Sequence, residues 1–430
     1  MASDARVRTL ELVRDLDEVQ MFGPRLGTVN PPCWEIGHVA FFWEVFCLRQ
    51  LGEEGALLPG GEELYDSFLV AHDDRWELAL PDRAGTEAYM QRVLERVLGR
   101  LGARTTPRES YLYQLCTQHE DMHGEALAWT RQTHGYPTPP IEVTAAPAAA
   151  VPSPTEQEAS SGNAAIPGGE FQLGAMPDEP FLFDNEKWAH PVAVAPFRMA
   201  RTPVTNAQFA DFVAEGGYDR DELWGYQGRL WRRRAAAEHP RYWRREGDAW
   251  LVRRFDRWLP LAPREPVIHV NWHEANAWCA WAGRRLPSEA EWELAAGAEP
   301  TPDGRGLSGR KRRYPWGDEP PTPARANTDM SAGGPVDVAA HPAGDSAFGC
   351  RQMLGNVWEW TASPFYPFPG FVLDEPYREY SAPWFGYHKV LRGGSWVARS
   401  RVLRNTYRNF ALPDRGDIFA GFRTCARDEG

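Results

Sequence analysis

A stretch poor in large apolar residues, 142–163, divides the 430-residue chain into two parts with different sequence patterns. It is rich in Ala, Pro, Ser and Glu, a composition typical of interdomain linkers. Before it, apolar residues recur at helical spacing; after it, short apolar runs alternate with Gly and Pro. We therefore predict an α+β protein with two domains, over 1–141 and 164–430, joined by the linker 142–163.

The first part predicts a four-helix bundle. A stripe through Val7, Val13 and Val19 indicates the first helix, since these apolar residues return to one helical face. The other three helices are predicted over 33–51, 86–101 and 109–134, and the residues 52–85 remain as one long connection.

The second part predicts short helices and strands held in irregular coil. Helix starts are indicated by the capping boxes Thr205–Gln208 and Ser288–Glu291. A hairpin is predicted over 242–255, with Glu246-Gly-Asp248 at its turn. The chain has 19 Trp, and we expect Trp and Arg side chains to pin the coil.

Charge and composition exclude several classes of function. The net charge is −12, which argues against nucleic acid or an anionic membrane as the main partner. The Arg-rich run 229–258 is interleaved with acidic residues, so it does not change this conclusion. No apolar run approaches 18 residues and no signal peptide is visible. Six cysteines without a CxxC motif fit a reducing compartment, so we expect a cytoplasmic protein.

The strongest candidate for chemistry is a pair of histidines in the fourth predicted helix. His119 and His123 are four residues apart, so both imidazoles leave one helix face about a turn apart. Apolar residues continue the same face, which predicts that the pair points into the bundle. This spacing suits two ligands of one metal ion, although two surface histidines would show the same pattern.

A third ligand is available in the second predicted helix. His38 shares a face with Trp34 and Phe42, which by itself also fits a buried core histidine. Beside an HxxxH helix in the same bundle, a ligand role is favoured; Glu125 or Glu44 are alternatives. Three histidines, or two with a carboxylate, suit non-haem Fe(II) better than structural zinc, which takes four ligands.

The long connection carries two further polar residues of interest. His72 and Arg75 follow an aromatic segment and are candidates for holding a polar substrate. The alternative is a solvated loop.

Two known folds resemble the two parts of the chain. The second part resembles formylglycine-generating enzymes, a loop-rich α+β fold of C-type-lectin-like architecture. The first part is similar to DinB-like four-helix bundles through Trp34, His38 and the segment Gln118–His123. The segments that carry the first resemblance are IPGGEF (166–171), TPVTNAQF (202–209), RLPSEAEWE (285–293), YPWGD (314–318), LGNVWEW (354–360), RGGSW (392–396) and FAGFR (419–423).

In this order the two folds resemble the ergothioneine-type sulfoxide synthases. The resemblance implies an enzyme that binds Fe(II) through His38, His119 and His123. It also implies use of O2 to join a chalcogen substrate to C2 of the imidazole of hercynine, with the substrate pocket formed where the two domains meet.

Two departures from these families narrow the expected activity. Formylglycine-generating enzymes have two functional cysteines where this chain has Ala398 and Leu403, so cysteine oxidation of that kind is not expected. Synthases that use γ-glutamylcysteine have an Asp where this chain has Ala411. Because the carboxylate for the substrate's ammonium group is missing, we favour the selenoneine-forming branch, in which a selenosugar is coupled to hercynine. A thiol co-substrate remains the alternative.

The resemblance also indicates substrate contacts and a proton donor. Aromatic faces suit the quaternary ammonium of hercynine, and a neutral phenol can donate a proton at pH 7. Core packing is the alternative role for each aromatic residue. The candidate contacts are Tyr407, Asn409, Phe410, Arg415, Trp360 and Phe419, and the candidate donors are Tyr377 and Tyr380.

Two other functions remain open. The second domain's fold also serves as a ligand-binding scaffold, so a non-catalytic binding protein is possible. The bundle's metal site would also suit a zinc hydrolase or thiol transferase.

Overall fold

The computed structural model describes residues 1–102, 104–141 and 152–427, and the chain forms two compact units. The helical unit comprises Met1–Glu142 with two later segments, Arg254–Arg257 and Asp374–Arg378; the mixed unit comprises the rest. Helices and strands together confirm the predicted α+β class. Of the predicted linker, 142–151 lie outside the described residues, and Pro154–Ala159 form helix α7.

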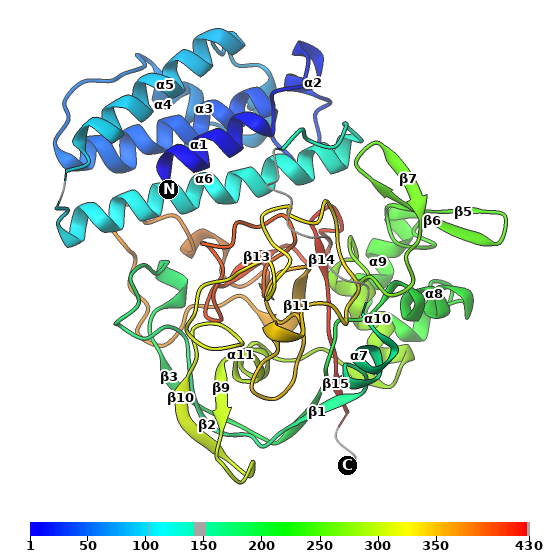
Figure 1. The fold of residues 1–430 in the computed structure, drawn as a ribbon. Coiled ribbons are helices and arrows are strands. Elements are labelled where there is room, and N and C mark those ends of the chain that lie inside the picture. The colour runs from blue at the N-terminus through cyan, green and yellow to red at the C-terminus, as the bar shows by residue number, and fades with distance from the viewer. Residues whose placement is uncertain (103, 142–151, 428–430) are drawn as a thin grey trace. The chain divides into compact units, whose positions relative to one another are not determined.

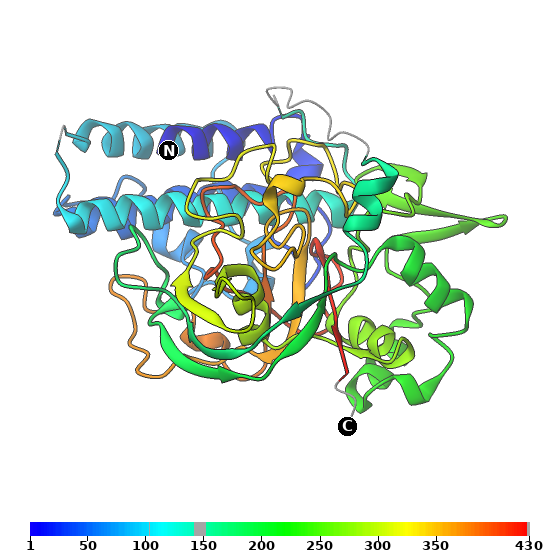
Figure 2. The same cartoon turned by 60° about the horizontal axis from the view of Figure 1, so that its bottom comes forward.

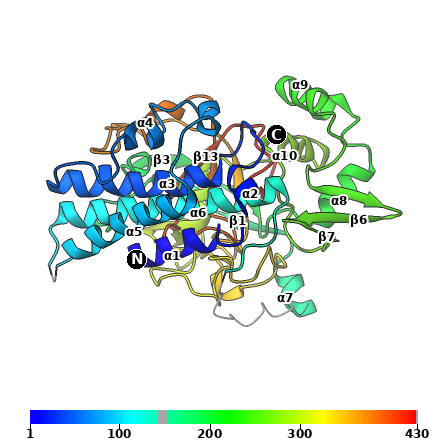
Figure 3. The ribbon, with the colours of Figure 1, turned by 90° about the horizontal axis from the view of Figure 1, so that it is seen from above.

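The long helices of the helical unit lie side by side (Figures 1 and 3). Helix α1 packs against α6, and α3 packs against α5 and α6. The predicted third and fourth helices are confirmed as α5 and α6, with bounds that differ by at most three residues. The helices are α1 Ala2–Glu11, α2 Glu18–Phe22, α3 Pro32–Trp43, α4 Gly61–Tyr65, α5 Arg83–Arg100 and α6 Pro107–His134.

The first two predicted helices differ in extent from the structure. Helix α1 ends at Glu11, and a separate helix, α2, begins after Asp17, which forms a capping box with Gln20. The predicted stripe is wrong at its ends: the exposed fractions of Val7 and Val19 are 56% and 80%.

The second predicted helix and the long connection also need correction. Helix α3 ends at Trp43 and continues as a π-helical turn, Glu44–Leu48, and a 3₁₀ turn, Arg49–Leu51. The connection 52–85 contains α4 and the 3₁₀ turn His72–Trp76. Neither was visible as a periodic pattern, because both elements are only five residues long.

A buried ion pair and its hydrogen bonds join four helices of this unit. Arg6 Nε donates to Glu120 Oε1 at 2.7 Å, and the indole of Trp43 donates to Glu120 Oε2 at 2.7 Å. Arg6 also donates to the carbonyl of Met90 in α5. All these side chains are buried, so the carboxylate depends on them in place of water.

The mixed unit contains small sheets and short helices. Two sheets have four strands, in the orders β1-β4-β15-β8 and β13-β12-β11-β14; β11 and β14 pair in parallel. Its helices are α7 Pro154–Ala159, α8 Asn206–Ala214, α9 Tyr226–Ala235, α10 Trp272–Trp281 and α11 Glu289–Gly297. Its strands are β1 Asn163–Ile166, β2 Gly169–Leu173, β3 His190–Val194, β4 Phe197–Ala200, β5 Trp243–Glu246, β6 Ala249–Arg254, β7 Arg257–Pro260, β8 Arg284–Arg285, β9 Ala298–Pro300, β10 Leu307–Lys311, β11 Trp358–Pro364, β12 Lys389–Arg392, β13 Asn409–Ala411, β14 Ala420–Gly421 and β15 Cys425–Ala426.

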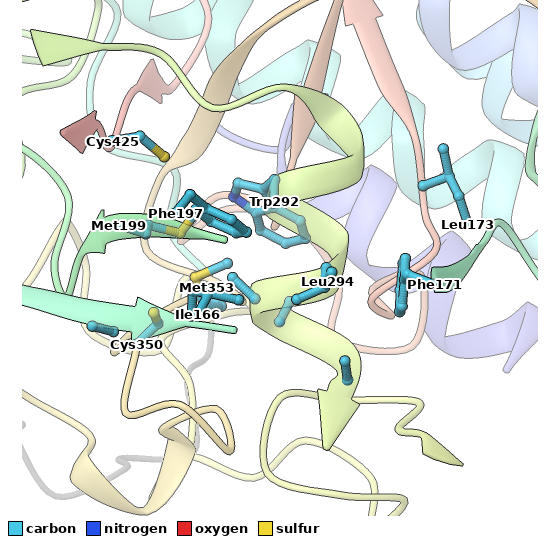
Figure 4. Packing of buried hydrophobic residues seen from close by; sticks show 14 of the residues in the cluster. Ile166, Phe171, Leu173, Phe197, Met199, Trp292, Leu294, Cys350, Met353 and Cys425 are labelled. Atoms are coloured by element: carbon cyan, nitrogen blue, oxygen red, sulfur yellow. The ribbon is translucent and has the colours of Figure 1, made fainter. Parts of the chain in front are cut away.

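Several local predictions for this unit are confirmed. The hairpin is formed by β5 and β6, which project from the rest of the unit (Figure 2). Both capping boxes are present, at the starts of α8 and α11. The indole of Trp292 in α11 lies in the core beside Phe197 and Met199 of β4 (Figure 4).

Buried arginines hold the irregular segments of the mixed unit. Arg423 donates to both oxygens of Glu359, at 2.6 and 2.7 Å. Arg408 donates to both oxygens of Glu289, and Arg392 shares Glu289. Since these charges are buried, each depends on its partner, and the coil between the strands is fixed by them as the sequence predicted.

All six cysteines are free thiols. No helix within the described ranges is long and apolar enough to cross a membrane.

The Arg6–Glu120 pair makes a testable prediction about stability. We expect Arg6→Ala to lower the free energy of unfolding by about 3–5 kcal/mol, because it leaves a buried carboxylate without its cation. Urea denaturation of the full chain measures this. Arg96→Ala, which removes a mostly exposed partner of Glu53, should change stability little. Equal effects of the two substitutions would contradict the argument.

Candidate metal centre

The structure brings the three predicted histidines together in the helical unit. His38 comes from α3, and His119 and His123 come from successive turns of α6. One ligand atom from each lies within 4.8 Å of the others. Among the histidine, cysteine and carboxylate side chains of the described residues, these three histidines have metal-ligand spacing.

The ring of His38 is held from behind by α4. Its Nδ1 lies 2.8 Å from the carbonyl oxygen of Tyr65. A carbonyl only accepts, so Nδ1 carries the proton and Nε2 keeps its lone pair. Gly37 makes this possible, because a Cβ there would lie 2.2 Å from the Tyr65 ring. The ring of Trp34 stacks on His38 at 4.7 Å between centroids.

His123 is oriented by a buried carboxylate. Its Nδ1 lies 2.5 Å from Glu35 Oε1, and Asn30 donates to Glu35 Oε2 at 2.7 Å. Burial alone would raise the pKa of Glu35, but the charge of His123 and its hydrogen bond outweigh burial and lower that pKa. A carboxylate behind an imidazole is a common arrangement around metal-binding histidines.

His119 lies against an aromatic wall. The ring of Phe42 stacks on it at 3.5 Å, nearly parallel. Its Nδ1 is buried and has no hydrogen-bond partner among the described residues, and its Nε2 is 3.1 Å from His123 Nε2. Two imidazole nitrogens this close are stable only with a proton or a metal cation between them, since facing lone pairs repel.

Burial favours the neutral form of two of the three imidazoles, those of His38 and His119. Burial, followed by the charge of His123, lowers the pKa of His38 to about 3. Burial also holds the pKa of His119 well below its usual range. Both rings are therefore neutral at pH 7, the form that binds a metal. The donor set fits a divalent transition-metal ion.

The alternative carboxylate ligands are not in this cluster. Glu44 is turned to other partners: it accepts from the Tyr89 hydroxyl at 2.7 Å and from Arg49 at 2.9 Å. Glu125 is buried in α6 but does not belong to the group with metal-ligand spacing.

Tyr377 belongs to the helical unit and lies beside the histidines. Its ring contacts His119 at 5.9 Å and Phe42 at 4.9 Å between centroids. The segment Asp374–Arg378 is also bound by the Tyr111 hydroxyl, which donates to Asp374 at 3.3 Å. The unit thus includes a tyrosine that lies 243 residues beyond His134, the end of its last helix.

Tyr380 and three substrate candidates lie together in the mixed unit. Tyr380 is half-buried, and its ring contacts Phe410 of β13 at 6.3 Å. Burial, and then Tyr407, raise the pKa of Tyr380 well above its usual range, so its hydroxyl stays protonated. Asn409 also lies in β13, next to Phe410.

The remaining candidates of the mixed unit serve its packing. Trp360 and Phe419 are 0% and 1% exposed, so both rings lie in the core, which is the alternative role that the sequence left open for them. Trp360 donates to the carbonyl of Val270. Arg415 forms a two-point ion pair with Asp417, at 2.6 and 2.7 Å.

The two candidates of the long connection are placed differently from each other. His72 is partly exposed and bonds the carbonyl of Val29 at 2.9 Å. Arg75 is only 8% exposed, and one guanidinium nitrogen donates to Asn30 at 2.6 Å. It is therefore neither a solvated residue nor part of the three-histidine cluster.

Sequence reasoning missed the residues behind the histidines. Glu35 and Asn30 precede His38 by three and eight positions, and neither shows a periodic signal. A glycine in the middle of an apolar helix, Gly37, was the available sign, since such a glycine often marks a close approach. Its partner Tyr65 could not be identified from the sequence.

Comparisons with known proteins agree with both parts of the chain. Residues 1–127 match the DinB superfamily, and residues 148–428 match the sulfatase-modifying factor enzyme 1-like domain. The hercynine oxygenase of Mycobacterium tuberculosis is 39% identical over 423 residues, covering 97% of this chain and 96% of that protein. The hercynine oxygenase of Mycolicibacterium thermoresistibile is 38% identical over 428 residues, covering 98% and 92%.

A more distant similarity is confined to one part. The formylglycine-generating enzyme of Streptomyces coelicolor is 34% identical over 317 residues, covering 65% of this chain and 94% of that protein. The chain is thus a two-domain protein, in which a DinB domain is followed by a sulfatase-modifying factor enzyme 1-like domain. Because similarity extends over nearly all of both chains, this protein belongs to the hercynine oxygenase family.

Proposed function

We propose that the protein is an Fe(II)- and O2-dependent enzyme that joins a chalcogen atom to C2 of the imidazole of hercynine. The observation that carries the proposal is the set of three histidine nitrogens within 4.8 Å of one another. Membership of the hercynine oxygenase family supports hercynine as the substrate. Bound Fe(II) would supply electrons and open coordination positions for the activation of O2.

The first candidate reaction uses the sulfur of a thiol, such as cysteine or γ-glutamylcysteine. The C2–H and S–H bonds break, a C–S bond forms and the sulfur is oxidised to a sulfoxide. O2 accepts the four electrons: one oxygen atom enters the sulfoxide and the other leaves as water. Full-length membership of the family supports this reaction over one with selenium.

The chain's own residues have distinct tasks in this proposal. His38 and His119 are neutral, so they can bind a metal without releasing a proton. Tyr377 is the candidate proton donor, because its ring lies against His119 and Phe42. A phenol ordinarily still carries its proton at pH 7 and can therefore donate it. Phe42 and Phe46 limit the positions open to that ring.

The second candidate reaction uses a selenosugar in place of the thiol. Ala411 favours it, since family members that use γ-glutamylcysteine have an Asp at this position. Ala411 lies in β13, opposite Lys389 of β12. A sugar has no ammonium group and does not need the missing carboxylate.

Metal binding gives the first test. Under anaerobic conditions we expect one Fe(II) per chain, and a loss of affinity of at least about 100-fold in His123→Ala, because changes behind a ligand already cost 10–100-fold. His72→Ala should bind normally, since that ring is outside the cluster. Full iron binding by His123→Ala would defeat the proposal, and activity with zinc alone would favour a hydrolase or transferase.

The co-substrate is tested by competition. We expect hercynine to be coupled to a thiol with consumption of O2, measured by an oxygen electrode and by mass spectrometry of the product. Faster coupling of a selenosugar would establish the second candidate. In Ala411→Asp we expect a lower KM for γ-glutamylcysteine, because the carboxylate can pair with its ammonium group. Hercynine binding without O2 consumption would instead indicate a scaffold.

The proton donor is tested by removing one hydroxyl. We expect Tyr377→Phe to lower kcat for the coupled product by about 10²-fold, a typical contribution of a general acid, while metal affinity stays unchanged. Tyr380→Phe is the matched control from the mixed unit. A larger loss in Tyr380→Phe than in Tyr377→Phe would reverse the assignment.

A further inference from the structure

Arg75 occupies an unusual position for a residue of a long connection. It lies in the turn His72–Trp76 between the exposed Asp74 and the half-buried Trp76, yet it is buried itself. One guanidinium nitrogen donates to the carbonyls of Ser67 and Val70, at 3.3 and 3.4 Å. Desolvation of this charged side chain costs free energy, which its contacts with the protein must offset.

The first set of contacts leads to His123. Arg75 Nη1 donates to Asn30 Oδ1 at 2.6 Å, which turns the amide nitrogen of Asn30 toward Glu35. An amide that accepts on one side must donate on the other. Glu35 therefore receives one hydrogen bond from Asn30 and directs its other oxygen to His123.

The second set of contacts leads to His38. The guanidinium carbon of Arg75 lies 3.9 Å from the centroid of the Trp34 ring. The same ring stacks on the imidazole of His38, with 4.7 Å between the centroids and 12° between the ring planes. The Trp34 indole is fixed in its plane because it donates to the carbonyl of Leu64 at 2.8 Å.

We propose that Arg75 is a positioning residue, which sets the orientation of His38 through Trp34 and of His123 through Asn30 and Glu35. The inference rests on the proposed metal centre. One side chain then couples ligands from two different helices, α3 and α6. It also replaces the prediction that Arg75 contacts the substrate, since its guanidinium is directed at Asn30, Trp34 and two carbonyls.

The test measures metal affinity rather than turnover. Co(II) or Fe(II) is titrated anaerobically into the full-length apo-protein. In Arg75→Gln we expect one ion per chain with affinity weakened about 10–100-fold, the usual effect of a residue behind the ligands. The control Arg83→Gln should stay within about twofold of wild type. Arg83 also serves the helical unit, but it bonds Glu87 and the carbonyls of residues 13, 14 and 16.

A double-mutant cycle tests the route through Asn30. If Arg75 acts through Asn30, the two substitutions should not be additive. The variant with both Arg75→Gln and Asn30→Ala should lose clearly less metal-binding free energy than the two single variants lose together. Asn30→Ala alone should weaken binding in the same range, and it decides the question if Arg75→Gln does not fold. Unchanged metal affinity with a raised KM in Arg75→Gln would overturn the inference and restore substrate contact.

A metal-free readout separates this inference from the proposed function. In apo-protein labelled with ¹⁵N-histidine, Arg75→Gln should shift the ring signals of His38 and His123 and leave His134 unchanged. If wild-type protein binds neither ion, the proposed function fails while the ring signals still test the positioning. If wild-type protein binds metal and neither affinity nor ring signals change in Arg75→Gln, the positioning alone fails.

Discussion

The buried carboxylate of Glu120 is the constraint on which the helical unit depends. It is the residue after His119 and accepts from Arg6 of α1 and Trp43 of α3. A buried carboxylate must be paired, so these bonds restrict how α6 can rotate and slide against α1 and α3. The same restriction determines where His119 and its neighbour on the next turn, His123, point.

The histidine rings of the cluster are held in place by groups that lie behind them. Each ring of the pair His38 and His123 has its Nδ1 engaged, by a carbonyl in one case and a carboxylate in the other. That leaves the remaining nitrogens to face one another. Small changes in the outer residues would turn the rings, which is why a metal site depends on groups that never touch the ion.

The division of the chain into units is not the division of the sequence into domains. Asp374–Arg378 belong to the helical unit although the residues before and after them belong to the mixed unit. This segment places the ring of Tyr377 against the ring of His119. A sequence pattern cannot reveal this, because no periodicity connects a short loop segment to a distant helix. The residues concerned are few and irregular.

The sequence by itself determined the helices α5 and α6, the hairpin, two capping boxes and the spacing of His119 and His123, because each depends on residues close together in the chain. It also carried the likeness that identified the family. Only the tertiary structure decided that Glu35 backs His123, that Arg75 is turned inward and that Trp360 is core. The physical reason is that burial and hydrogen-bond partners are set by contacts between distant segments, and the free energy of a buried polar group depends on which partner reaches it.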